Sequence, residues 1–301
     1  MDNSEDGRLN YSFYSGEDLY SDGEIEDVML DLVKSNVDLE TVIATDNRWP
    51  ILYHFSNKRQ NLLEWYPFKE GAEVLEIGAG CGAITGILCD KCKHVTSVEL
   101  SKKRSLINFY RNSDKPNLEI IVGNLNDIKF DKKFDYITLI GVLEYAALYT
   151  ASDSPYIDFL INIKKNLKPN GTLIIAIENK FGLKYWAGAK EDHTGVIFDG
   201  LEGYPSKRKV YTFSKPELIT TLNDAGFLEN TFYYPYPDYK LPNSIYSDRR
   251  LPKIGELQND IVNYDQSRML FFSEQAVYDS ILHSEGEYAF FSNSFLVFSK
   301  S

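Results

Sequence analysis

The sequence lacks any apolar run long enough to form a membrane-spanning helix. Such a helix needs about 20 consecutive apolar residues, and no stretch of this 301-residue chain reaches that length. The first nine residues are acidic and polar, which is unlike a secretory signal peptide. We therefore expect a cytoplasmic protein that is not inserted into a membrane.

Cysteine is scarce, with only Cys81, Cys89 and Cys92 in the chain. An odd and sparse count argues against a disulfide framework and favours a reducing compartment. Cys89 and Cys92 have the spacing of half a zinc site, but no second pair of ligands follows. Histidines and carboxylates elsewhere show no metal-ligand spacing either. The sequence therefore predicts that the protein works without a metal.

Basic residues are also few, with 32 against 44 acidic ones and a net charge of −12. The excess of acid lies in residues 1–50, which contain 13 acidic and three basic residues, a net charge of −10. The remaining 251 residues are nearly neutral, with a net charge of −2. Because no basic stripe is present to bind phosphates, we do not expect nucleic acid as a partner.

The order of apolar segments predicts an α/β fold. Short apolar runs alternate with helical segments from residue 73 on, and strands are expected at 73–77, 94–99, 118–122, 134–140, 172–178, 228–234 and within 288–298. This rhythm is typical of a mainly parallel sheet with helices on both faces. Two irregular insertions interrupt it, at about 180–213 and 237–285. Long insertions in a compact domain usually carry function.

The first 69 residues have a different character. Residues 1–22 are polar and predict a loose arm, whereas residues 24–34 have the pattern of an amphipathic helix. A second helix is expected over about 50–65. We predict two parts, an acidic N-terminal arm with a helical cap over 1–69 and a main domain over 70–301.

A glycine-rich turn follows the first strand of the main domain. The segment VLEIGAGCGA at 74–83 is a buried strand running into a turn that opens a helix. Glycines in such a turn let a ligand lie against bare backbone. Glu99 ends the next strand, where its carboxylate can accept hydrogen bonds from both hydroxyls of a ribose. Together these features predict a nucleoside-bearing ligand.

The same pattern also suits a dinucleotide such as NAD. Glu76 stands two residues before Gly78, and its charge would repel a pyrophosphate but attract an ammonium or a sulfonium group. Asn124 closes the third strand, where polar side chains could read an adenine edge. These details favour a positively charged adenosyl ligand over NAD.

Five segments resemble the class I S-adenosylmethionine (SAM) dependent methyltransferases. They are VLEIGAGCGAIT (74–85), VTSVELSKKR (95–104), EIIVGNLNDI (119–128), FDYITLIGVLEYA (134–146) and LKPNGTLIIAIEN (167–179). The resemblance covers roughly residues 70–236 and the last strand. It implies a Rossmann-like, seven-stranded sheet whose last strand is antiparallel. With the elements expected above, the N-terminal helices cap this fold and the insertions follow strands five and six.

The resemblance also implies the residues that bind SAM, whose product is S-adenosylhomocysteine (SAH). Glu76 and the glycines of the turn would line methionine and ribose, Glu99 would hold the ribose, and Asn124 and Leu125 would flank adenine. Gly141 would approach the methionine end. The full set implied is Glu76, Gly78, Gly80, Gly82, Glu99, Leu100, Asn124, Leu125 and Gly141.

A narrower resemblance covers almost the whole chain. Residues 179–205 and 232–248 resemble bacterial methyltransferases associated with lipopolysaccharide or surface-polysaccharide biosynthesis, which are often fused to glycosyltransferases. It implies a sugar or glycan as the small-molecule acceptor. It also implies a glycosyltransferase as a partner or a fused domain.

A sugar hydroxyl is a weak acid, so its methylation needs a general base. Asp192 and His193 in the first insertion are candidates, because histidine titrates near neutral pH. Glu178 ends a strand at the edge where open α/β sheets bind ligands. The catalytic set is therefore expected to be His193, Asp192 and Glu178. The alternative for His193 is a structural role in which hydrogen bonds tie down the loop.

The sequence as a whole predicts a SAM-dependent O-methyltransferase of a sugar or glycan precursor in surface-polysaccharide biosynthesis. Residues 141–144 read Gly-Val-Leu-Glu, not the Asn-Pro-Pro-Tyr of enzymes that methylate nucleic-acid amines. The alternative is a SAM-binding module without turnover that organises a glycosyltransferase assembly. An NAD-linked enzyme is a third and weaker hypothesis.

Overall fold

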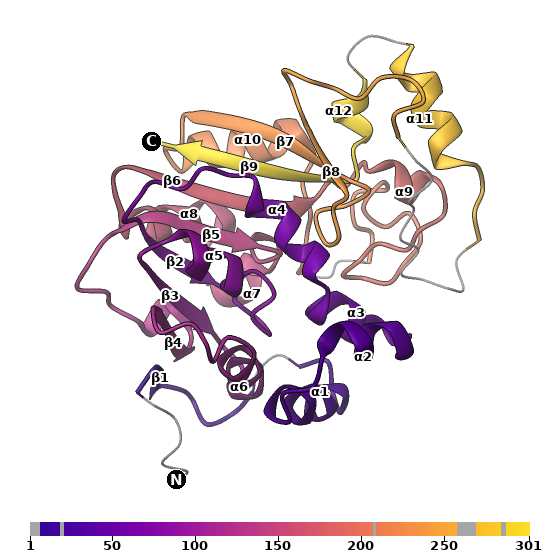
Figure 1. Ribbon diagram of the computed structural model, residues 1–301. Helices are drawn as coiled ribbons and strands as arrows, with labels where there is room; N and C mark the ends of the chain where they lie inside the picture. Colours follow the sequence, from indigo (N-terminus) through magenta and orange to yellow (C-terminus); the bar gives the residue numbers. More distant parts are fainter. Residues whose placement is uncertain (1–6, 19–20, 207–208, 258–268, 284–286) are drawn as a thin grey trace. The chain divides into compact units, whose positions relative to one another are not determined.

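The computed structural model describes residues 7–18, 21–206, 209–257, 269–283 and 287–301 (Figure 1). The chain forms two compact units. The first comprises Met1–Ile140 and Asn166–Thr172, and the second comprises Gly141–Lys165 and Leu173–Ser301. Parts of the expected N-terminal arm and of both expected insertions lie outside the described residues.

The first unit contains a five-stranded parallel sheet in the order β1-β4-β3-β2-β5 (Figure 1). The strands are β1 (Leu9–Phe13), β2 (Glu73–Ile77), β3 (His94–Glu99), β4 (Leu118–Gly123) and β5 (Phe134–Ile140). Strands β2 to β5 lie where the apolar runs predict them. Their Val, Ile and Leu residues are almost all buried, as expected for parallel strands covered on both faces.

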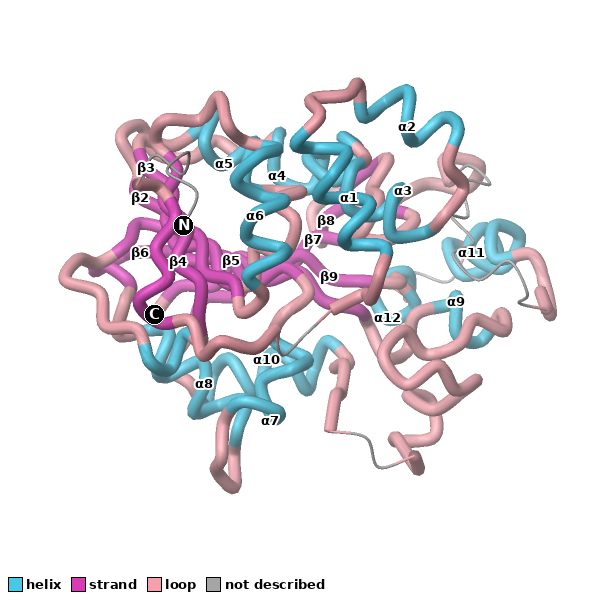
Figure 2. Tube along the Cα trace, turned by 90° about the horizontal axis from the view of Figure 1, so that it is seen from below, coloured by secondary structure: helices cyan, strands magenta, loops and turns pink. Residues whose placement is uncertain are grey.

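Two helices pack on this sheet, α5 (Thr85–Lys91) and α6 (Lys102–Arg111) (Figure 2). Helix α6 begins at the residue after Ser101, whose hydroxyl accepts a hydrogen bond from the Arg104 backbone N–H at 3.2 Å. Such a cap satisfies one of the backbone donors left free at a helix start. It fixes where the chain turns from β3 into α6.

The N-terminal segment departs from the prediction in two ways. The expected arm contains β1, which pairs with β4 and was not predicted. The expected helix over 50–65 is broken into α3 (Trp49–Phe55), a 3-10 helix η1 (Asn57–Gln60) and α4 (Asn61–Glu64). The break lies at Ser56, whose extended backbone ends α3 and whose hydroxyl accepts from the Lys58 N–H at 3.3 Å. Two further helices, α1 (Ile25–Lys34) and α2 (Leu39–Thr45), precede this break.

The second unit contains four strands in the order β6-β9-β7-β8. They are β6 (Leu167–Glu178), whose residues up to Thr172 belong to the first unit, β7 (Glu229–Tyr236), β8 (Ser244–Ser247) and β9 (Ser294–Lys300). Their pairings are antiparallel. Strand β6 starts earlier than predicted, and the expected turn survives in it as Asn170 with φ of 63°. The expected last strand is shorter, because α12 (Tyr288–Phe291) precedes β9.

The prediction of seven strands is wrong, because the described residues form nine. The additional strands are β1 and β8, which lie at the ends of the strand orders given above. Each adds hydrogen-bond partners to a neighbour that would otherwise leave its backbone groups unpaired. Neither belongs to the five segments that resemble the class I methyltransferases, although β8 lies within residues 232–248. The α/β architecture itself agrees with the prediction.

The remaining helices of the second unit include α7 (Ala146–Tyr149), α8 (Pro155–Lys164) and α10 (Lys215–Asp224), which pack on one another (Figure 2). The insertions add α9 (Leu183–Trp186) and α11 (Glu274–Leu282). Within the described residues, no helix combines the length and apolar character that crossing a membrane requires. The start of α10 is a capping box, in which Ser214 and Glu217 exchange hydrogen bonds.

We expect Ser214→Ala to lower the free energy of unfolding by about 1 kcal/mol, because it removes one half of the capping box. Urea titrations of the variant and the wild-type protein measure the difference. The matched control is Thr220→Ala, an exposed position on the same helix, which should change the free energy by less than about 0.5 kcal/mol. Equal losses in both variants would contradict the capping role.

Candidate active site

The glycine turn between β2 and α5 is tied to the end of β3. The backbone N–H groups of Gly78 and Ala79 both donate to the Val98 carbonyl, at 2.8 and 3.2 Å. Gly82 has φ of 76°, and an added Cβ there would lie 2.2 Å from the Asn108 Oδ1 on α6. A side chain at this position would collide with α6, so glycine is required for the turn to pack against the helix.

Glu99 is the carboxylate expected to hold a ribose. It is buried, and its two oxygens accept from the Gly80 N–H at 2.8 Å and the Ser101 N–H at 2.9 Å. Burial raises the pKa of Glu99, against the backbone donors that favour its charged form. A carboxylate can accept about four hydrogen bonds. Glu99 therefore organises the turn and keeps acceptor capacity for ribose hydroxyls.

Glu76 is also buried, at the centre of β2. Its Oε2 accepts hydrogen bonds from the hydroxyls of Thr85 and Ser97, both at 2.6 Å. Burial raises the pKa of Glu76 to about 7, although these two hydroxyls oppose the shift. Glu76 therefore links β2 to the start of α5 and to β3 by side-chain hydrogen bonds. Its expected contact with the methionine part of SAM stays a prediction.

The residues expected around adenine, Asn124 and Leu125, follow β4, and the expected cofactor residue Leu100 follows β3. The Asn124 side chain accepts from the Asn126 N–H at 3.0 Å and caps the 3-10 helix η2 (Leu125–Asp127). Leu125 is buried, and Leu100 is partly exposed. Strands β3 and β4 are parallel neighbours, so their carboxyl ends meet at one edge, where α/β sheets bind ligands. All expected cofactor residues except Gly141 thus belong to the first unit, and Gly141 belongs to the second.

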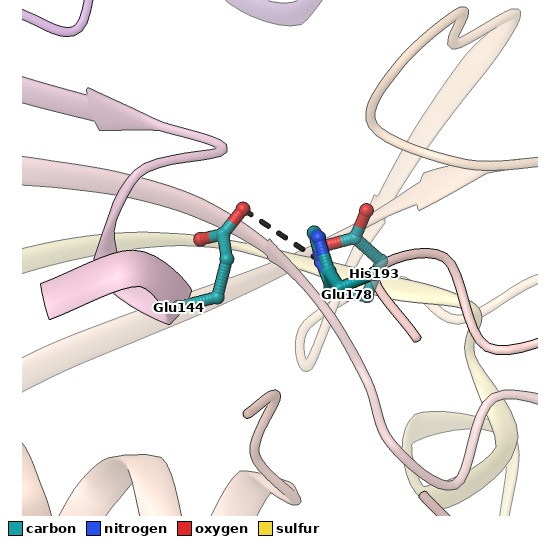
Figure 3. Close-up of side chains that lie close together, drawn as sticks. All are labelled: Glu144, Glu178 and His193. Carbon is teal, nitrogen blue, oxygen red and sulfur yellow. Dashed lines mark hydrogen bonds and ion pairs between the residues drawn. The ribbon is translucent and has the colours of Figure 1, made fainter. Parts of the chain in front are cut away.

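The second unit contains a compact cluster of ionisable side chains (Figure 3). Glu178 ends β6, Glu144 lies in the 3-10 helix η3 (Leu143–Tyr145), and His193 lies in the first insertion. The His193 Nε2 is 3.4 Å from the Glu178 Oε2 and 3.9 Å from the Glu144 Oε1. Three segments that are distant in the sequence therefore meet at one imidazole.

Two lysines balance the acids around this cluster. The Lys240 ammonium donates to Glu178 and, at 3.0 Å, to Asp192. The Lys184 ammonium lies 2.8 Å from both Asp192 and Asp238. Burial alone would raise the pKa of Glu178, but the nearby Lys240 and His193 charges hold it well below its usual range. Glu178 and Asp192 are therefore charged.

His193 is held through both its ring and its backbone. Its Nδ1 is 3.0 Å from the Tyr145 hydroxyl, and its backbone N–H donates to Glu191 at 2.8 Å. Burial favours the neutral ring, yet the carboxylates of Glu178 and Glu144 raise the pKa of His193 to about 9. The imidazole is accordingly protonated at neutral pH in the protein without ligands. A general base at His193 would first have to lose that proton.

Glu144 is a site residue that the sequence analysis missed. Its side chain is buried, and neither carboxylate oxygen has a hydrogen-bond partner within the described structure. Burial raises the pKa of Glu144 to about 8, and the charge of Glu178 adds to this shift. An added Cβ at Gly141 would lie 3.6 Å from the Glu144 Oε1 and 2.9 Å from the Tyr239 hydroxyl. The backbone at Gly141 therefore lies close to the cluster.

The structure brings the three expected catalytic residues together. Asp192 and Glu178 share the Lys240 ammonium, and His193 contacts Glu178. Lys240 comes from the second insertion, so both insertions contribute to the cluster. The catalytic role of the three residues stays a prediction.

Comparisons with known proteins identify the domain. Residues 75–173 match a family described as "Methyltransferase domain". A ubiquinone biosynthesis O-methyltransferase of Rickettsia akari (strain Hartford) is 25% identical over 182 residues, which cover 58% of this chain and 67% of that protein. A ribosomal RNA small subunit methyltransferase A of Syntrophus aciditrophicus (strain SB) is 21% identical over 212 residues, which cover 66% of this chain and 74% of that protein.

A solved structure shows the same fold. The phosphoethanolamine N-methyltransferase 1 of Haemonchus contortus, in complex with phosphoethanolamine and SAH, matches with a TM-score of 0.50 and 14% identity. The match covers 91% of this chain and 49% of that chain, so this chain spans about half the length of that protein. At such low identity, the likeness concerns the fold alone.

Residues 75–173 therefore match a methyltransferase domain, and the structure has the expected Rossmann-like α/β fold. SAM as the methyl donor, with SAH as its product, agrees with the match to a methyltransferase domain. The glycine turn and Glu99 fit this cofactor, because the turn presents bare backbone and the carboxylate retains acceptor capacity.

We expect Glu76→Gln to change how stability depends on pH. The pKa of Glu76 in the folded protein is about 7, above its ordinary value of 4.5, so Glu76 stabilises the folded wild-type protein below pH 4.5 and this contribution is lost as pH rises through 7. The glutamine carbonyl can accept from both hydroxyls and does not ionise. The variant should therefore gain up to about 3 kcal/mol of unfolding free energy relative to wild type between pH 5 and 8.

Urea unfolding at several pH values measures this trend. The control is Glu70→Gln, which replaces an exposed carboxyl just before the same strand. Its difference in unfolding free energy from wild type should not change between pH 5 and 8. A flat difference for Glu76→Gln would contradict the burial argument.

Proposed function

We propose that the protein is a SAM-dependent O-methyltransferase that acts on a sugar or glycan precursor of surface-polysaccharide biosynthesis in the cytoplasm. The observation that carries the proposal is the buried polar cluster of the second unit. Lys240, Asp192, His193 and Glu178 offer both donors and acceptors in a small volume. A polyhydroxylated acceptor matches such a set, whereas an apolar acceptor would leave these groups unpaired.

Tyrosine hydroxyls extend the polar cluster. The Tyr185 hydroxyl donates to Asp192 at 2.6 Å, and the Tyr239 hydroxyl donates to Glu178 at 3.2 Å. Each ring combines an apolar face with a polar tip, a combination that suits the two faces of a sugar. The cluster could thus hold an acceptor by exchanging some of these internal hydrogen bonds for bonds to its hydroxyls.

Methyl transfer to a hydroxyl requires that the acceptor oxygen is positioned and that one proton is removed from it. SAM supplies an activated methyl group, so the acceptor oxygen forms a bond to the methyl carbon while the carbon–sulfur bond breaks and its electron pair stays on sulfur. Holding the acceptor oxygen in line with that bond supplies most of the acceleration. The hydroxyl proton passes to a basic group of the cluster. We infer that His193, Asp192 and Glu178 hold the acceptor and take part in this proton transfer.

The choice of acceptor is supported by sequence. Residues 179–205 and 232–248, which resemble the polysaccharide-associated methyltransferases, supply Asp192, His193 and Lys240. The same resemblance suggests a glycosyltransferase as a partner or fused domain. One relative carries the name of a ribosomal RNA methyltransferase, but the acidic charge of residues 1–50 does not favour an RNA acceptor here.

A second candidate function is a SAM-binding module without turnover, which would organise a glycosyltransferase assembly. The observation that favours it is the internal pairing of the cluster, since Lys184 and Lys240 are already hydrogen-bonded to Asp238, Asp192 and Glu178. Charges paired in this way can serve structure alone.

Incubation with SAM carrying a labelled methyl group tests the proposal. The acceptors offered are a panel of nucleotide sugars and oligosaccharides, with a demethylated quinol and ribosomal RNA as the competing classes. Label in the sugar fraction is the expected result. Label only in the quinol or RNA would overturn the sugar acceptor, and saturable SAM binding without any transfer would favour the module without turnover.

We expect Glu99→Gln to weaken SAM binding by about 10- to 100-fold. The carboxylate is the charged acceptor proposed for the ribose, and hydrogen bonds to charged groups contribute about 1.5–3 kcal/mol. Isothermal titration with SAM measures the dissociation constant, and thermal unfolding shows that the variant is folded. Glu70→Gln is again the matched control and should bind SAM as the wild type does. Equal affinity in both variants would remove Glu99 from the site.

A further inference from the structure

The buried carboxyl group of Glu144 has only one oppositely charged neighbour close to it in the described structure, the His193 Nε2 at 3.9 Å from its Oε1, which is too far for a hydrogen bond. Both of its oxygens are enclosed, and neither has a hydrogen-bond donor among the described residues. Burying a carboxylate without compensation costs several kcal/mol, and buried polar groups in folded proteins nearly always have a partner. We therefore expect the Glu144 carboxyl group to bind a further group that is not part of the described chain.

Two other side chains that can bind metals, those of Glu178 and His193, lie next to the Glu144 carboxyl group. One ligand atom each from Glu144, Glu178 and His193 can be chosen so that all three lie within 4.8 Å of one another. Figure 3 shows Glu144 directed toward the His193 ring, with Glu178 beside it. The three residues come from η3, the end of β6 and the first insertion. Two carboxylates and an imidazole are a common set of metal ligands.

Neighbouring groups orient these ligand atoms. The Tyr145 hydroxyl at the His193 Nδ1 leaves the Nε2 facing the carboxylates. Lys240 and Tyr239 both bind the Oε1 of Glu178, which leaves its Oε2 on the side of His193. In metal sites the second nitrogen of a ligating histidine is usually held in this way.

We propose that Glu144, Glu178 and His193 bind a divalent transition-metal cation. An imidazole with two carboxylates suits Mn²⁺, Fe²⁺ or Zn²⁺ better than Ca²⁺ or Mg²⁺, which prefer oxygen ligands alone. Ligands at about 2.1 Å from a metal lie roughly 3 Å apart. The present separations of 3.4 and 3.9 Å from the His193 Nε2 would thus have to close by less than about 1 Å.

The nearest competing cation is the Lys240 ammonium. It donates to the Oε1 of Glu178, and it is also paired with Asp192 at 3.0 Å and lies 4.0 Å from Asp238, so acids that are not proposed ligands offset part of its charge. Metal binding here rests on these side chains and not on the identity of the methyl acceptor.

The test uses the full chain, stripped with a chelator and titrated with Mn²⁺ in the absence of SAM and acceptor. We expect one Mn²⁺ per chain by isothermal titration, and at least tenfold weaker binding for Glu144→Gln and for His193→Gln. Glu202→Gln, which replaces an exposed carboxyl of the same unit, should bind as the wild type does. Circular dichroism shows whether each variant is folded.

A second measurement does not depend on the variants. Pulsed electron paramagnetic resonance of the wild-type protein with Mn²⁺ should show coupling to one imidazole nitrogen. No saturable binding, equal affinity in the folded Glu144→Gln variant, or bound Mn²⁺ without nitrogen coupling, which means an adventitious ion only, would each overturn the proposal. Because no methyl transfer is measured, failure here is distinct from failure of the proposed O-methyltransferase activity.

Discussion

The second unit depends on keeping the charge of Glu178 buried at the end of β6. A buried carboxylate is stable only if its charge and its lone pairs are satisfied. Lys240, His193 and Tyr239 supply those partners from both insertions. Because Glu178 is stable only with these partners, residues of both irregular insertions pack around it. The two insertions therefore belong to one ionic cluster.

In the first unit, the buried carboxyl groups are hydrogen-bonded by neutral donors. Glu99 is bound by backbone N–H groups, and Glu76 by the hydroxyls of Thr85 and Ser97. Without a nearby ammonium in those hydrogen bonds, burial dominates and the pKa of each carboxyl rises. A carboxyl group whose pKa is raised by burial is one that a nearby positive charge would favour in its ionised form.

Local signals account for the parts that were predicted well. Strands β2 to β5 follow from apolar runs, and the start of α10 follows from the Ser214 and Glu217 pair, because both are encoded within a few residues. Strands β1 and β8 have no such signal, since short edge strands are defined by the neighbour they pair with. The helix expected over 50–65 failed at Ser56, where a polar cap competes with an otherwise suitable pattern.

The sequence by itself determined the α/β order, the glycine turn and the acidic residue that ends the next strand. These are consequences of chain-local sterics and hydrophobic periodicity. Only the tertiary structure decided that Glu144 faces His193 and Glu178. Along the chain Glu144 and Glu178 are 34 residues apart, and Glu178 and His193 are 15 residues apart, too far for any spacing rule to indicate a shared site. The orphaned state of the Glu144 carboxylate is likewise a property of what surrounds it, which no local pattern encodes.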